Sequence, residues 1–144
     1  MSQHKHIQQK LANLRQHLVL LLQRTNDIDS SGSTTLQSVI KRLGTPGNVK
    51  NRASQANPLA DLLPQIKQAN ATLPLMCQNM VDNVIELANH LPWYQRPVAN
   101  NQGFMASHVN AQIIGPEGLE VRQDLIVGVT LMRPNIDYPD HHHE

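Results

Sequence analysis

The spacing of apolar residues changes near residue 92, and this change restricts the possible fold more than any other feature. Before residue 92, apolar residues recur every three or four positions, as on one face of an α-helix. After it, apolar and polar residues alternate, as in strands with one buried face. All aromatic residues also follow residue 92, whereas Leu, Ile, Val, Met and Ala fill the earlier part. We therefore predict a helical region over residues 1–92 and a β-rich region over residues 93–144.

The sequence pattern over residues 1–44 predicts two helices. The first runs from Gln3 to about Arg24, where apolar residues form one stripe at helical spacing. A second helix begins at Thr34, because its spacing to Gln37 matches a capping box. This helix stops at Gly44, which a Thr-Pro pair follows. Each helix therefore has one apolar face to bury.

The rest of the helical region contains a loop and two further helical segments. Residues 44–57 are polar and rich in turn-forming side chains, which predicts an exposed loop. A third segment opens at Pro58, and Pro64 is expected to kink or restart it. The last helix is predicted over residues 75–90, where methionines at helical spacing are typical of core packing.

The sequence pattern after residue 92 predicts β-strands. Residues 108–113 alternate strictly, and residues 115–118 (GPEG) form a tight turn with two glycines. Alternation returns over residues 119–122, and residues 125–132 form a nearly continuous β-prone run, as in an inner strand. The expected fold class is α+β, with helices first and an antiparallel β-meander after them.

Charge and composition exclude several classes of protein. The chain has 12 basic and 11 acidic side chains, and a net charge of +1 favours neither nucleic acid nor an anionic membrane as a partner. Apolar runs are too short for a membrane span or a secretory leader. The single Cys77 cannot form an internal disulfide, in agreement with a reducing compartment. We therefore expect a cytoplasmic protein.

Residues 138–144 (YPDHHHE) are a candidate metal site. In an extended strand, His141 and His143 point to one side while His142 points away. Two imidazoles side by side provide half of a facial metal site, and Tyr138 is close enough to act as an outer ligand or a base. Two other interpretations remain open, the remnant of a purification tag and a solvated chain end.

Four stretches from residue 92 onward carry a family resemblance: PWYQR, HVNAQIIGPEGL, LIVGVTLMRP and DYPDHHH. Together they resemble the dimethylsulfoniopropionate (DMSP) lyases of the cupin superfamily, of the DddL/DddQ type. The Tyr-Pro-x-His-x-His spacing is the most specific part of this resemblance. It implies a helical N-terminal region followed by the first strands of a cupin (jelly-roll) barrel, here over residues 93–144 and incomplete.

The resemblance also implies an activity. His141 and His143 correspond to the two leading metal ligands of the family, and the metal is a divalent transition ion such as zinc, iron or manganese. The family cleaves DMSP by β-elimination to dimethyl sulfide and acrylate. A metal that holds the carboxylate acidifies the adjacent proton, which either Tyr138 or a later tyrosine removes. The expected partner is thus a small-molecule substrate, and since cupins often pair, a homodimer is an open expectation.

Trp93 and Tyr94 allow two interpretations. Their rings can face the sulfonium cation of the substrate, or they can be buried where the helices meet the barrel. The family pattern also includes a glutamate ligand four residues after the second histidine, whereas Glu144 directly follows His143. We therefore expect the N-terminal part of a lyase, inactive by itself. The alternatives are a metal- or ligand-binding cupin with another role, such as a sensor or isomerase, and a helical interaction module.

Overall fold

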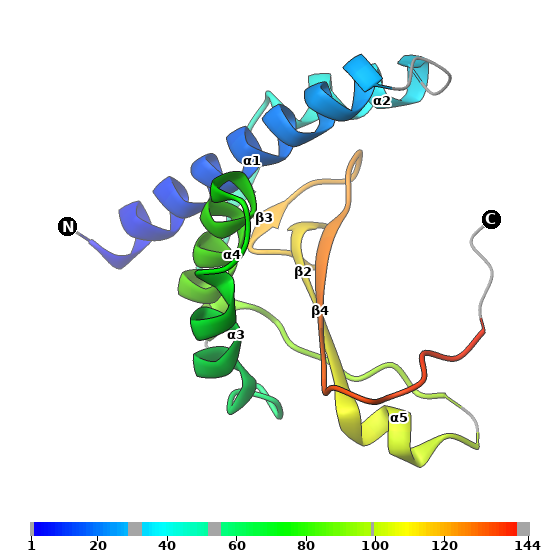
Figure 1. The fold of residues 1–144 in the computed structure, drawn as a ribbon. Coiled ribbons are helices and arrows are strands. Elements are labelled where there is room, and N and C mark those ends of the chain that lie inside the picture. Colours follow the sequence, from blue (N-terminus) through cyan, green and yellow to red (C-terminus); the bar gives the residue numbers. More distant parts are fainter. Residues whose placement is uncertain (1, 29–32, 52–55, 99, 141–144) are drawn as a thin grey trace.

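The computed structural model describes residues 2–28, 33–51, 56–98 and 100–140. The long helices that precede residue 92 lie on one side of a mixed sheet, and the C-terminal segment passes along its other side, next to the short helix of residues 102–107 (Figure 1). The sheet is open rather than closed into a barrel over the described residues. This arrangement confirms the predicted α+β class.

The helices before residue 92 lie close to where the sequence predicts them, whereas the helix over residues 102–107 was not predicted and lies in the region expected to be β-rich. The helices are α1 (Gln3–Ile28), α2 (Ser33–Leu43), α3 (Leu62–Asn70), α4 (Leu75–Leu87) with the 3-10 turn η2 (Ala88–His90), and α5 (Gln102–Ser107). The prediction that this helix opens at Pro58 was wrong, because residues 58–61 form turns and α3 begins at Leu62. Pro64 lies in the first turn of α3, where a backbone N–H needs no helical partner. In the described part of the chain, no helix has the length and apolar character needed to cross a membrane.

The strands differ from the predicted meander. They are β1 (Asn48–Val49), β2 (His108–Gly115), β3 (Glu120–Val121) and β4 (Val127–Met132), in the order β1-β3-β2-β4. The prediction that residues 44–57 form only a loop was wrong, because β1 lies within them and pairs with β3. β4 was predicted as an inner strand, but it lies at an edge of the described sheet.

β2 and β3 run parallel, although four residues separate them, so the prediction of a purely antiparallel meander was also wrong. The chain makes a full loop after Gly115, and the backbone N–H groups of Gly118 and Arg122 both donate to the Gly115 carbonyl. Gly115 has φ 146°, which disfavours other residues. At Gly118 a Cβ would lie 2.7 Å from the Ile113 carbonyl oxygen. Gly115 and Gly118 therefore allow the chain to loop back so that β3 runs parallel to β2.

Both predicted regions contribute to one hydrophobic core. Its fully buried members include Leu11 of α1, Leu87 of α4, and Val109 and Ile114 of β2. Trp93 belongs to the same core, and its indole N–H donates to the Ala88 carbonyl at 2.7 Å. Neither secondary structure nor packing changes completely at residue 92, because β1 precedes it, α5 follows it and the core extends across it.

Buried charges connect the helices to the sheet. Glu120 is fully buried; it pairs with Arg15 of α1 and accepts a hydrogen bond from the Gly47 N–H at 2.8 Å. Arg122, also buried, donates to the Arg42 carbonyl at 2.5 Å. Because an unpaired buried charge is strongly unfavourable, these contacts hold α1 and the end of α2 against β3.

Candidate functional site

Of the residues predicted to carry the chemistry, the structure describes Tyr138 and leaves His141 and His143 outside the described residues. Tyr138 lies on the segment that follows β4, and Figure 1 shows this segment on the side of the sheet opposite α1, α3 and α4. The tyrosine side chain is half exposed, at 51% of its full accessible surface. It is therefore open to a small molecule on this side.

An aromatic stack supports the Tyr138 ring. Tyr138 meets Phe104 edge to face, with ring centroids 5.2 Å apart at 84°. Phe104 in turn stacks on His108, at 3.9 Å and 15°, and the His108 Nδ1 lies 2.6 Å from the Phe104 carbonyl oxygen. Both Phe104 and His108 are buried. Tyr138 thus rests on a fixed support at the start of β2.

Arg133 anchors the segment that leads to Tyr138. Its backbone N–H donates to the Ser107 carbonyl at 2.9 Å, which extends the pairing of β4 with β2. Its guanidinium makes two hydrogen bonds to the Asp61 carboxylate, at 2.9 and 3.0 Å. The hydrogen bond from Arg133 lowers the pKa of Asp61. The chain then turns at Asn135, which has φ 60°.

The two faces of the sheet have opposite chemistry. Facing the helices are apolar pairs such as Val109 with Leu131 and Ala111 with Val129. The alternate positions, Asn110 with Thr130 and Gln112 with Gly128, face the other way. We call this second surface the helix-free face, because α1, α3 and α4 lie on the other side; the short helix α5 borders it only at the start of β2, where Phe104 stacks on His108. This face combines polar side chains with the Tyr138 segment and so offers hydrogen-bonding groups to a polar substrate.

A cavity of about 350 Å³ lies on the opposite side, between the helices and the sheet. Its lining is almost wholly apolar, with Leu14, Met80, Val84 and Ile113 among the contributors. No titratable side chain lines it, and none of its lining residues comes from the segment after β4. We therefore place the candidate site on the helix-free face.

The structure separates Trp93 from Tyr94. Trp93 is 5% exposed and packs in the core. Tyr94 pairs with Asn110 in an antiparallel bridge and is 44% exposed. Because directly opposed residues in such a bridge share a face, Tyr94 projects with Asn110 onto the helix-free face.

The described residues include no group of three or more His, Cys, Asp or Glu side chains that could hold a metal ion. His141 and His143, the predicted ligands, lie beyond this part of the chain. Their imidazoles suit a divalent transition metal and would supply two ligands. Sequence reasoning did not identify Asn110 or Thr130, although the strict alternation of residues 108–113 places Asn110 on the polar face.

Comparison with known proteins adds a family and a fold. A family model described as dimethylsulfoniopropionate lyase matches residues 31–144. The chain is similar to a solved structure described as "Crystal structures of DMSP lyases RdDddP and RnDddQII", with a TM-score of 0.51 and 17% identity. That match covers 86% of this chain and 58% of the other, so the sequence spans less than two thirds of its length. No curated protein matches.

Proposed function

Because the chain belongs to the dimethylsulfoniopropionate lyase family, we propose that it takes part in cleaving DMSP to dimethyl sulfide and acrylate. The match over residues 31–144 carries this proposal. The polar helix-free face beside Tyr138 supports it, since the substrate is a small zwitterion.

In the proposed reaction, Tyr138 acts as the base. Its phenolate oxygen takes a proton from the carbon next to the substrate carboxylate. The electron pair of that C–H bond forms the double bond of acrylate, and the bond from the β-carbon to sulfur breaks. Dimethyl sulfide leaves as a neutral molecule, and the proton remains on Tyr138. The stack with Phe104 and His108 keeps the ring in place.

A phenol titrates near ~10 in water, so a tyrosine base needs a cation nearby. We propose that His141 and His143 hold a divalent transition metal such as zinc, iron or manganese. When bound, such an ion would acidify the substrate proton and favour the phenolate. If this segment is a strand, the spacing of two places His141 and His143 on one side and His142 on the other, which suits this role.

The test is gas release by the protein expressed from its complete native reading frame. We expect dimethyl sulfide in the headspace when zinc, iron or manganese and DMSP are added, and none after chelation. Replacing Tyr138 by Phe removes the base while keeping the ring that packs on Phe104, so turnover should fall at least 100-fold with metal binding retained. Metal binding without gas would contradict the lyase and favour a ligand-binding role instead.

A further inference from the structure

Asn110 is held in a defined orientation on the helix-free face. Its backbone N–H and C=O both bond to Tyr94, at 2.8 Å each. Toward β4 it therefore faces Thr130 in a non-hydrogen-bonded pair, in which side chains approach closely. The Thr130 hydroxyl donates to the Asn110 Oδ1 at 2.7 Å. This bond fixes the amide with its two Nδ2 donors turned away from Thr130.

Those donors are available to a ligand. Asn110 is half buried, and no residue in the described ranges accepts a hydrogen bond from its Nδ2 group. An amide held by one hydrogen bond and left with two open donors is suited to an acceptor such as a carboxylate oxygen.

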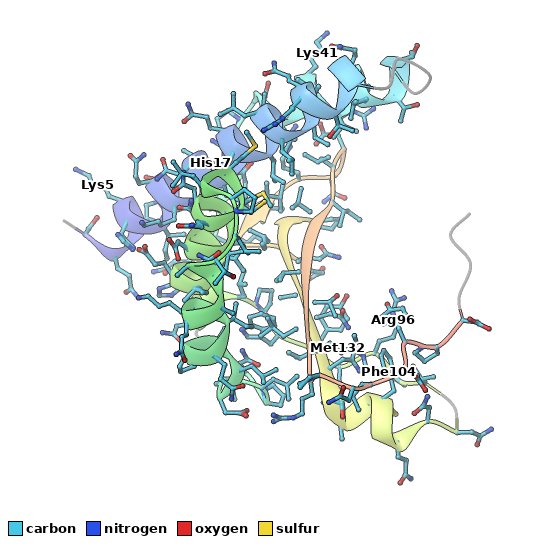
Figure 2. All side chains as sticks on the ribbon, in the orientation of Figure 1. Lys5, His17, Lys41, Arg96, Phe104 and Met132 are labelled. Atoms are coloured by element: carbon cyan, nitrogen blue, oxygen red, sulfur yellow. The ribbon has the colours of Figure 1, made fainter. Side chains whose placement is uncertain are left out.

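Arg96 brings a positive charge to the same side of the sheet. Figure 2 shows its side chain on the helix-free side, near the C-terminal segment. It is exposed, and within the described chain no carboxylate pairs with it, whereas Arg15, Arg122 and Arg133 are all paired. With no counter-charge among the described residues, its guanidinium is suited to bind an anion.

We propose that Arg96 and Asn110 form a subsite for the carboxylate end of the substrate, with Thr130 positioning Asn110. Guanidinium and amide groups both donate, and a carboxylate accepts several such bonds in addition to a metal. The cationic sulfonium is repelled by Arg96, and the exposed ring of Tyr94, on the same face as Asn110, can bind it by a cation–π contact. This subsite rests on the proposed function and adds to it how the two ends of the substrate are distinguished.

The test measures binding of three probes by calorimetry to the protein from its complete reading frame. The probes are DMSP, propionate as the carboxylate end, and trimethylsulfonium as the cationic end. Replacing Arg96 by Gln should weaken DMSP and propionate binding about tenfold or more and should not weaken trimethylsulfonium binding. Lys41, an exposed cation on α2 far from this face (Figure 2), gives the matched control Lys41→Gln, which should change nothing.

Substitutions of Thr130 test separately whether this residue positions the Asn110 amide. Thr130→Val has the same shape but lacks the hydroxyl, so DMSP binding should weaken, while Thr130→Ser should retain it. The side-chain amide signals of Asn110 in a nitrogen-15 spectrum should shift on titration with propionate. If Arg96→Gln and Lys41→Gln bind all three probes alike, or the wild type binds neither carboxylate, the subsite is wrong.

The subsite proposal and the lyase proposal can be contradicted independently of each other. Dimethyl sulfide release with an unchanged KM in Arg96→Gln would overturn the subsite and leave the lyase standing. Carboxylate binding that depends on Arg96, without any gas from the wild type, would retain the subsite and contradict the lyase.

Discussion

Arg133 and Asp61 form a two-fold hydrogen-bonded ion pair that ties the segment carrying Tyr138 to the chain just before α3. The pair spans 72 positions of sequence, so it fixes where the segment leaves β4. Its effect on folding depends on the ionisation of Asp61, whose pKa is lowered by the hydrogen bond from Arg133.

The first prediction concerns the pH dependence of this pair. A lowered pKa in the folded state means that the stabilisation is present above the unfolded pKa of about 3.9 and is lost as the pH falls through the folded value. The melting temperature of Asp61→Asn should therefore lie slightly below that of the wild type at neutral pH. The two curves should converge under acidic conditions. A difference of the same size across the whole pH range would contradict this assignment.

A second prediction concerns Glu120, the fully buried carboxylate that pairs with Arg15. Replacing it by Ala leaves the partner cation partly buried without a counter-charge, so urea denaturation should give a loss of about 3–5 kcal/mol. Glu86 is the matched control, because it pairs with Lys10 at 2.8 Å but is half exposed. Glu86→Ala should cost less than about 1 kcal/mol. Equal losses for the two variants would show that burial does not increase the contribution of Glu120 to the free energy of unfolding.

The close approach of Gly47 to β3 gives a third prediction. A Cβ at this position would lie 2.6 Å from the Arg122 Cγ and 2.7 Å from the Val121 carbonyl oxygen. Gly47→Ala must displace backbone as well as a side chain, and should destabilise the protein by about 1–3 kcal/mol. Gly103 in α5 has its nearest neighbouring atom 3.9 Å from the added carbon, so Gly103→Ala should be neutral or slightly stabilising. Comparable losses in denaturation midpoint would contradict the steric argument.

The contrast between local and long-range structure explains what the sequence could predict. Helices such as α1 and α4 follow from local periodicity, and β2 follows from strict alternation. The two-residue strand β1 carries too few positions to show a pattern, and its pairing with β3 depends on Glu120, far away in sequence. Parallel pairing of β2 and β3 likewise depends on how the loop after Gly115 closes.

The candidate site was likewise predictable from local sequence patterns only in part. Tyr138 was identifiable from its motif, and Asn110 could have been placed on the polar face by alternation alone. The pairing of Asn110 with Tyr94 and Thr130 required the sheet register, which joins three distant segments. Sequence spacing likewise gave no indication that Asp61 would hold Arg133.

The last prediction uses the three consecutive histidines as their own control. If residues 141–143 are extended and His141 and His143 share a face, only these two can hold the same ion. Replacing either by Ala should reduce transition-metal content after dialysis by about tenfold or more, with parallel loss of dimethyl sulfide release. His142→Ala changes the composition of the tail equally but should leave metal content and activity unchanged. Equal losses of metal from all three variants would indicate nonspecific binding by a histidine-rich tail. Full metal content in all three variants would show that the metal binds at another place in the protein.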